Sequence, residues 1–115
     1  MEIVSDEYRI NYDPATHAIL LAGSLRLRGM AEYAPVIEML DRAVHDEPET
    51  IVLDLRDLQF LNSSGINMLF RFVIDVRERK KSRIVVKGTI ESPWQQKSLE
   101  NLQKLMPELQ LDWGE

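Results

Sequence analysis

Four small polar residues interrupt the most apolar part of this sequence. Residues 60–69 read FLNSSGINML, and Asn62, Ser63, Ser64 and Gly65 lie between a strand-like run and a helix-like run. A serine at the start of a helix offers a hydroxyl that can cap a free backbone N–H group of the first turn. The same hydroxyl could instead attack a substrate as a nucleophile or accept a phosphoryl group.

The surroundings of Ser63 and Ser64 argue against a nucleophilic serine. Such a serine needs a neighbouring base, usually a histidine, and a turn of the Gly-x-Ser-x-Gly type. The only histidines, His17 and His45, lie at the ends of predicted elements distant in sequence, and Asn-Ser-Ser-Gly does not match that turn. We therefore expect no enzyme activity and no cofactor.

Asp54 is a second candidate for phosphoryl chemistry, because it ends a predicted strand as the acceptor aspartate of a receiver-type domain does. A receiver site needs further carboxylates after the first strand, to bind magnesium, and a lysine downstream. Here the first predicted strand opens a hairpin instead of leading into a helix. We predict that Asp54 orders the loop that follows it, and that no metal binds there.

A regulatory phosphoserine fits this position better than either form of catalysis. The dipole at a helix N-terminus favours the added charge of about −1.5 to −2. Modification there would leave the fold intact and place a dianion beside the surface of the following helix. On spacing alone, simple capping by Ser63 or Ser64 is the alternative, with Asn62 in an Asx-type turn and Gly65 allowing a tight bend.

The helix predicted over residues 64–80 has more apolar surface than packing against a sheet requires. At 100° per residue its apolar arc spans roughly 240°, against the ~100° that such packing needs. Asn67 and Arg71 lie on the narrow polar stripe, and the surplus apolar surface falls at Met68 and Ile74. Either neighbouring helices cover this surplus, or it is an exposed patch for a protein partner.

The composition is that of one folded globular domain, which we assign to residues 1–115. The chain is 44% hydrophobic and 29% charged, and 115 residues suffice to bury a core. The net charge of −5 argues against binding to nucleic acid. The absence of cysteine excludes disulfides and thiolate metal sites. The sequence shows no signal peptide or membrane-spanning stretch, so we expect a cytoplasmic protein without membrane contact.

The hydrophobic periodicity predicts strands and helices in the order ββαβαβαβ. Strands separated by helices imply parallel pairing with right-handed crossovers, and the opening hairpin adds an antiparallel strand. We therefore predict an α/β fold with a mixed sheet and with helices mainly on one side or split unevenly. The predicted elements lie at 7–13, 17–23, 30–45, 50–55, 64–80, 84–88, 93–106 and 109–113.

Residues 51–66, IVLDLRDLQFLNSSGI, resemble the signature of STAS domains, the family of the anti-sigma-factor antagonists. That signature is a buried strand ending in Asp-Leu, a short linker with an aromatic residue, and Asp-Ser-Ser-Gly-Leu opening a helix. The element order and the length agree as well. The resemblance covers roughly residues 7–113, which we take as the core of a STAS-like domain.

The resemblance implies a non-enzymatic partner-switching protein of bacteria. In the family, the first serine of the pair, here Ser63, is phosphorylated by a serine kinase that acts as an anti-sigma factor. A PP2C-type phosphatase removes the phosphate, and the unphosphorylated form binds the kinase or anti-sigma regulator. Ser63 is therefore the predicted phosphoacceptor, and Asn62, Ser64, Gly65 and Asp54 are predicted to shape its loop.

The family's contact surface includes the loop before this helix and the helix itself. The corresponding partner-binding residues are predicted to be Asn67, Met68, Arg71, Ile74 and Arg26. This chain departs from the family at Asn62, where an acidic residue is usual, and at residues 23–26, where Gly-Ser-Leu-Arg replaces Gly-Glu-Leu-Asp. An acidic edge facing the partner thereby becomes basic. The alternative prediction is a constitutive scaffold of the same fold, in which Ser63 only caps the helix.

Overall fold

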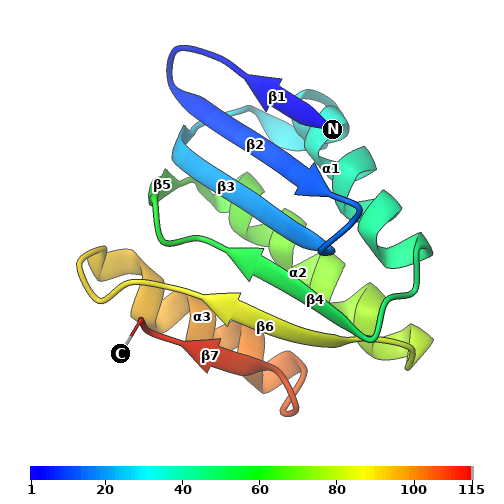
Figure 1. Cartoon of the computed structure of the whole chain (residues 1–115). Coiled ribbons are helices and arrows are strands. Elements are labelled where there is room, and N and C mark those ends of the chain that lie inside the picture. Colours follow the sequence, from blue (N-terminus) through cyan, green and yellow to red (C-terminus); the bar gives the residue numbers. More distant parts are fainter. Residues whose placement is uncertain (115) are drawn as a thin grey trace.

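Within residues 1–114, which the computed structural model describes, seven strands form one mixed sheet, and three helices cover one of its faces (Figure 1). The helices are α1 (Gly29–His45), α2 (Ser63–Arg79) and α3 (Pro93–Leu105). The strands are β1 (Glu2–Val4), β2 (Tyr8–Asp13), β3 (Ala18–Leu25), β4 (Thr50–Asp54), β5 (Leu58–Leu61), β6 (Arg83–Lys87) and β7 (Gln110–Asp112). The predicted α/β fold with a mixed sheet is confirmed.

Two short strands, β1 and β5, lie outside the predicted element order. β1 pairs antiparallel with β2 and precedes the core predicted to start near residue 7. β5 lies between β4 and α2 and pairs in parallel with the end of β3, where Leu25 lies opposite Leu61. Neither β1 nor β5, of three and four residues, has a hydrophobic alternation that marks it as a separate strand in the sequence.

The topology brings the starts of the helices to one end of the sheet. The parallel part of the sheet has the order β3, β4, β6 and β7. The first three residues of β3 pair with β4, and its last three residues pair with β5. A helix that connects parallel strands starts near the C-terminal end of the strand before it. Ser63, at the start of α2, therefore lies at the same end of the sheet as β5 and the start of α3 (Figure 1).

The core lies between the helices and one face of the sheet. Alternate strand residues that face the helices are fully buried, among them Ile19, Ile51 and Ile84. Their neighbours on the opposite face, such as Val52 and Val85, are only half-buried. β4 and β6 are therefore fully buried on one face only, because all three helices pack on the same side (Figure 1).

A polar contact joins β2 to the end of α1. The Tyr12 hydroxyl donates to Asp46 Oδ2 at 2.6 Å, and Arg42 Nε donates to Asp46 Oδ1 at 3.2 Å. The bond from Tyr12 is the main reason that the pKa of Asp46 lies below its ordinary value of 3.8; partial desolvation opposes it, and Arg42 reinforces it. The contribution of Asp46 to stability is therefore present above about pH 4 and is lost as the pH falls through the lower folded-state pKa.

We expect Asp46→Asn to flatten the loss of stability of the chain below about pH 4, because the variant has no carboxylate to protonate there. Urea unfolding at a series of acid pH values measures this. Glu38→Gln, at an exposed position of the same helix, should keep the wild-type acid dependence. If the free energy of unfolding falls with pH in the same way for Asp46→Asn and wild type, Asp46 does not contribute to the acid dependence of stability.

Candidate functional site at the start of α2

Asn62, and not a serine, caps helix α2. The Asn62 Oδ1 atom accepts a hydrogen bond from the backbone N–H of Gly65 at 3.0 Å, and its backbone is extended, with φ −78° and ψ 176°. Ser63 already belongs to the first turn. The prediction that Ser63 or Ser64 caps the helix is wrong, because Asn62 is the last extended residue after β5. The scaffold alternative thereby loses the capping role that it gave to Ser63.

The Asn62 side chain also joins three segments of the chain. Its Oδ1 atom accepts a second hydrogen bond from the hydroxyl of Tyr33 in α1 at 2.7 Å, and its Nδ2 donates to the carbonyl of Leu27 at 2.7 Å. Burial raises the pKa of Tyr33, so the phenol stays protonated as a donor. An asparagine fits here because the position needs both an acceptor and a donor.

Ser63 is exposed in the first turn of α2, whereas Ser64 is half-buried. Among the described residues, the Ser63 hydroxyl has no hydrogen-bond partner in the protein. The helix N-terminus around it favours negative charge. A phosphoryl group on Ser63 would therefore replace no contact of the fold.

Gly65 is needed for close packing and not for a tight bend. It lies inside α2 with its position buried. A Cβ atom there would overlap Leu61 Cδ1 and would lie 2.8 Å from the Tyr33 hydroxyl. Gly65 thus allows α2 to approach β5 and α1 closely enough for Tyr33 to reach Asn62.

Asp54 acts on the loop between β4 and β5. It accepts hydrogen bonds from the backbone N–H of Arg56 at 3.1 Å and from the Arg56 guanidinium at 3.0 and 2.8 Å. Partial burial by itself would raise the pKa of Asp54, but the hydrogen bonds and charge of Arg56 outweigh it and hold the pKa below its ordinary value. In the described chain no hydrogen bond joins Asp54 to residues 62–65.

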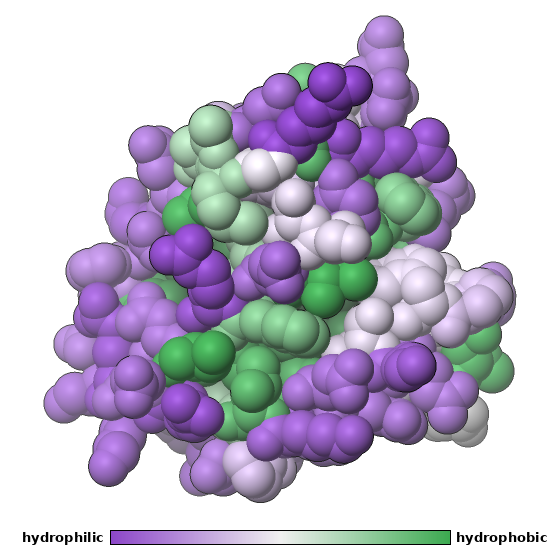
Figure 2. Space-filling view, turned by 180° about the vertical axis from the view of Figure 1, so that it is seen from behind, coloured by the Kyte–Doolittle hydropathy of each residue, from purple (hydrophilic) through white to green (hydrophobic). Residues whose placement is uncertain are grey.

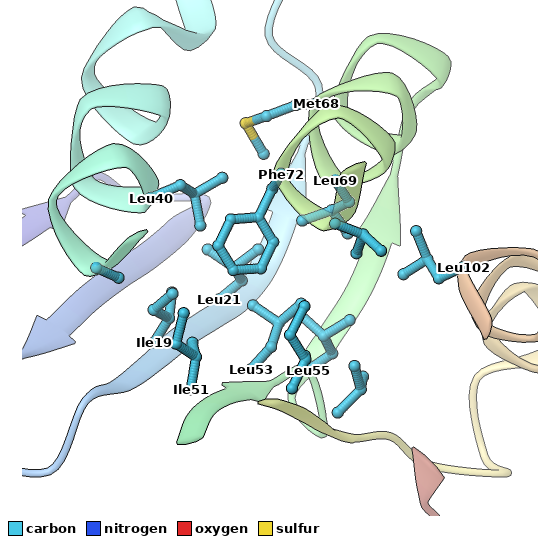
Figure 3. Packing of buried hydrophobic residues seen from close by; sticks show 14 of the residues in the cluster. Ile19, Leu21, Leu40, Ile51, Leu53, Leu55, Met68, Leu69, Phe72 and Leu102 are labelled. Atoms are coloured by element: carbon cyan, nitrogen blue, oxygen red, sulfur yellow. The ribbon is translucent and has the colours of Figure 1, made fainter. Parts of the chain in front are cut away.

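The prediction that the surplus apolar surface of α2 is exposed at Met68 is wrong. Met68 is only 2% exposed, and it lies between α1 and α2 beside Leu40 and Phe72 (Figure 3). α2 is the middle helix, with α1 and α3 on its two sides, and neighbouring helices therefore cover most of its surplus apolar surface. Ile74 is half-buried.

The exposed side of α2 combines polar residues with an apolar hollow. Ser63, Asn67 and Arg71 follow one another at spacings of four, which puts them on one face of the helix, and all three are exposed. A hollow of about 260 Å³ lies between α1 and α2, and of these three residues Arg71 lines it. On this side of the molecule apolar side chains gather between hydrophilic ones (Figure 2). The hollow is lined by Met30, Ile37, Leu40, Asp41, Met68, Arg71, Phe72 and Asp75.

Arg26 and Phe60 form an exposed pair next to the start of α2. The Arg26 guanidinium carbon lies 4.7 Å from the centroid of the Phe60 ring. Phe60 is 39% exposed although it belongs to β5, while its neighbour Leu61 is buried. Phe60 is the aromatic residue of the linker in the STAS-like stretch 51–66. Nothing in the sequence indicated its contact with Arg26.

The comparisons with known proteins now identify the family. The family model of the STAS domain matches residues 31–109. The chain belongs to the STAS-domain family. Compared with curated proteins, the sequence matches none significantly.

Solved structures share the fold of this STAS domain. A chain in the structure of the complex between the Pseudomonas aeruginosa diguanylate cyclase SiaD and its activator SiaC has a TM-score of 0.74 at 13% identity over 98% of each chain. Apo-SiaC from the same organism has a TM-score of 0.73 at 13% identity over 97% of each chain. An anti-sigma factor antagonist from Mycobacterium paratuberculosis has a TM-score of 0.59 at 20% identity, over 96% of this chain and 82% of that one.

A buried glutamine that the sequence did not reveal stabilises the end of the STAS domain at which α2 and α3 start. Gln95, at the start of α3, is fully buried, and its Nε2 donates to the carbonyls of Leu55 and Leu58 at 2.7 and 3.1 Å. These carbonyls lie where β4 has ended and β5 begins. The neighbouring Trp94 is half-buried and donates its indole N–H to the carbonyl of Gln59 at 3.0 Å.

Both histidines of the STAS domain are engaged far from Ser63. His17 Nδ1 lies 3.1 Å from the Tyr12 hydroxyl in the β2–β3 hairpin, and His45 Nδ1 lies 2.7 Å from the carbonyl of Asp41 at the end of α1. Over residues 1–114, no three histidine or acidic side chains are grouped to hold a metal ion. No helix in that range is both long and apolar enough to cross a bilayer.

Proposed function

We propose that this STAS domain is a non-enzymatic regulatory domain that binds a protein partner, and that phosphorylation of Ser63 switches this binding off. The observation that carries the proposal is the division of roles between Asn62 and Ser63. Asn62 supplies the cap of α2 through its bond to Gly65, while Ser63 is exposed beside it. The fold therefore does not need the hydroxyl that would be modified.

The helix terminus makes a phosphate at Ser63 tolerable. A phosphoserine adds a charge of about −1.5 to −2 at neutral pH, and the positive end of the helix dipole stabilises such a charge. The domain would stay folded in both states. Only the charge of one exposed site would change, which is how a local modification controls binding without a change of fold.

The proposed docking surface follows from what is exposed around Ser63. It comprises Ser63, Asn67 and Arg71 on α2, the hollow between α1 and α2, and the pair of Arg26 and Phe60. The two arginines of this surface lie beside accessible apolar side chains, and the hollow also contains Asp41 and Asp75. The surface suits a partner that offers acidic groups opposite the arginines and apolar groups opposite the hollow and Phe60. A dianion at Ser63 would repel such a partner.

The proposed partners are signalling proteins. Membership of this chain in the STAS family supports a serine kinase or anti-sigma-like regulator as the binding partner. It also supports a PP2C-type phosphatase as the enzyme that reverses the modification. The likeness to SiaC, the activator of a diguanylate cyclase, adds signalling enzymes to the candidate partners. We propose that the domain acts in the bacterial cytoplasm. The distance of both histidines from Ser63 supports a binding role over hydrolysis.

Affinity capture from extracts of the host tests this function. The unmodified domain and Ser63→Ala should recover the same partner, and the domain carrying phosphoserine at 63 should recover at least about tenfold less, since tenfold corresponds to only about 1.4 kcal/mol. Thr16→Glu, which adds a charge in the exposed β2–β3 turn at the other end of the sheet, is the matched control. It should bind like wild type.

Equal recovery with all four baits would overturn the switch and leave constitutive binding. The mass of the intact protein from its host, measured with and without phosphatase treatment, shows independently whether Ser63 carries a phosphate. A protein that never carries the additional mass would contradict the proposed regulation.

A further inference from the structure

Arg26 is held directly against the residue that precedes Ser63. The Asn62 backbone N–H donates to the carbonyl of Leu25 at 3.2 Å, and the Asn62 side chain donates to the carbonyl of Leu27 at 2.7 Å. Arg26 lies between these two anchored carbonyls. Neighbouring strands lie about 4.8 Å apart, so the backbone of Arg26 is within the reach of an arginine side chain from Ser63.

The Arg26 side chain at present rests on an exposed aromatic ring. Its guanidinium carbon lies 4.7 Å from the centroid of Phe60, a residue three positions before Ser63. A cation–π contact at an exposed site is weak, whereas an arginine that binds a phosphate through two N–H groups forms one of the strongest polar contacts in proteins. A phosphate at Ser63 would therefore compete successfully with the ring for the guanidinium.

The other arginines in this region are less suited to bind a phosphate at Ser63. The Arg56 guanidinium is paired with Asp54 at 2.8 Å. Arg71 lies eight residues along α2, which at 1.5 Å per residue is about 12 Å along the helix axis. Arg28 is exposed, but its backbone N–H is bound by the carboxylate of Glu32, which therefore lies close by.

We infer that Arg26 is the phosphate-binding residue of the Ser63 switch, and that its guanidinium leaves the Phe60 ring to bind the phosphate. This inference rests on the proposed function and specifies its regulation. The two states then present different surfaces. The unmodified domain shows a cation stacked on Phe60, and the phosphorylated domain shows a bare ring beside a phosphate whose charge Arg26 partly neutralises.

The domain carrying genetically encoded phosphoserine at position 63 provides the test. Phosphorus NMR measures the second pKa of the phosphate, which Arg26 should lower, so that in Arg26→Ala it rises by roughly half a unit. Arg26→Lys should give an intermediate value, because lysine keeps the charge but lacks the planar fork. In proton NMR, the Arg26 Nε–H signal should lose its ring-current shift from Phe60 on phosphorylation.

Arg28→Ala is the matched control and should leave the phosphate pKa within about 0.2 units of the unsubstituted value. The inference is overturned if Arg26→Ala leaves the phosphate pKa unchanged, if Arg28→Ala moves it as much, or if the Phe60 and Arg26 signals do not respond to phosphorylation. Because the phosphoserine is genetically encoded and does not depend on a host kinase, a failure here leaves the proposed switch standing. Conversely, a host protein without phosphate would leave the Arg26 result standing.

Discussion

Asn62→Ala is expected to lower the free energy of unfolding of this STAS domain by roughly 2–4 kcal/mol. The substitution removes the cap of α2, the acceptor of the Tyr33 hydroxyl and the donor to the Leu27 carbonyl. Loss of a cap alone costs about 1 kcal/mol. The remainder comes from the buried Tyr33 hydroxyl and the Leu27 carbonyl, which are left without partners.

Asn62→Asp is the more discriminating substitution, because aspartate caps helices as well as asparagine does. The family usually has an acidic residue at this position, yet here we expect a loss of roughly 1–3 kcal/mol. A carboxylate cannot donate to the carbonyl of Leu27, which lies 2.7 Å from Asn62 Nδ2. The two oxygens would face each other. The neighbouring loop at residues 26–28 therefore determines that asparagine is preferred in this chain.

Urea unfolding near neutral pH measures both losses. Asn67→Ala and Asn67→Asp, at an exposed position of the same helix, are the matched controls and should lie within about 0.5 kcal/mol of wild type. An Asn62→Asp variant as stable as wild type would show that the bond to Leu27 contributes nothing and that the acidic residue of the family would serve equally well.

Gly23→Ala is expected to cost roughly 2–5 kcal/mol, because the substitution combines backbone strain with steric overlap. Gly23 has φ 90°, a conformation that residues with a side chain rarely adopt. A Cβ atom there would overlap the carbonyl oxygen of Glu7 and lie 2.9 Å from Tyr8 Cα, and both are backbone atoms that cannot rotate away.

The position of Gly23 links this cost to the functional site. The register of β3 against β5 shifts between Gly23 and Ser24, and the N–H of Gly23 donates to the carbonyl of Asp57 at 2.9 Å. β3 pairs with β4 through its first three residues and with β5 from Gly23 onward, so Gly23 lies where the pairing with β5 begins. β5 leads through Asn62 into Ser63. A side chain at Gly23 should therefore loosen β5 as well as the hairpin of β2 and β3.

Urea unfolding together with amide hydrogen exchange in β5 measures the effect of Gly23→Ala. Gly29→Ala is the control, since Gly29 also has a positive φ of 64° but has open space around it. That variant should cost only about 1–2 kcal/mol, from backbone strain alone. Equal losses for both variants, with unchanged exchange in β5, would contradict a steric role for Gly23.

The sequence was most informative where a signal is local. The change of hydrophobic period predicted the alternation of strands and helices, and residues 51–66 resembled the STAS signature, which the family match confirms. The same stretch located an accessible serine at the start of a helix. These features depend on neighbouring residues along the chain, so they can be recognised without knowing which elements meet in space.

Contacts between distant segments could not be predicted in this way. Whether Met68 is exposed depends on α1 lying beside α2, and a helical wheel describes one helix at a time. The partners of Asn62 lie 29 and 35 residues away, in α1 and in the loop before it. Gln95 has no sequence signal at all, because the carbonyls of Leu55 and Leu58 that it binds come close to it only through the packing of α3 against the link between β4 and β5.

The sequence by itself determined the family, the order of the helices and of strands β2, β3, β4, β6 and β7, and the candidate phosphoacceptor Ser63. Only the tertiary structure decided that Asn62 caps the helix, that Met68 is core, and that Arg26 rests on Phe60 beside the site. The physical reason is the range of the interactions. Helix and strand formation reflects local periodicity, whereas capping choice, burial and side-chain pairing depend on which distant segments the sheet brings together.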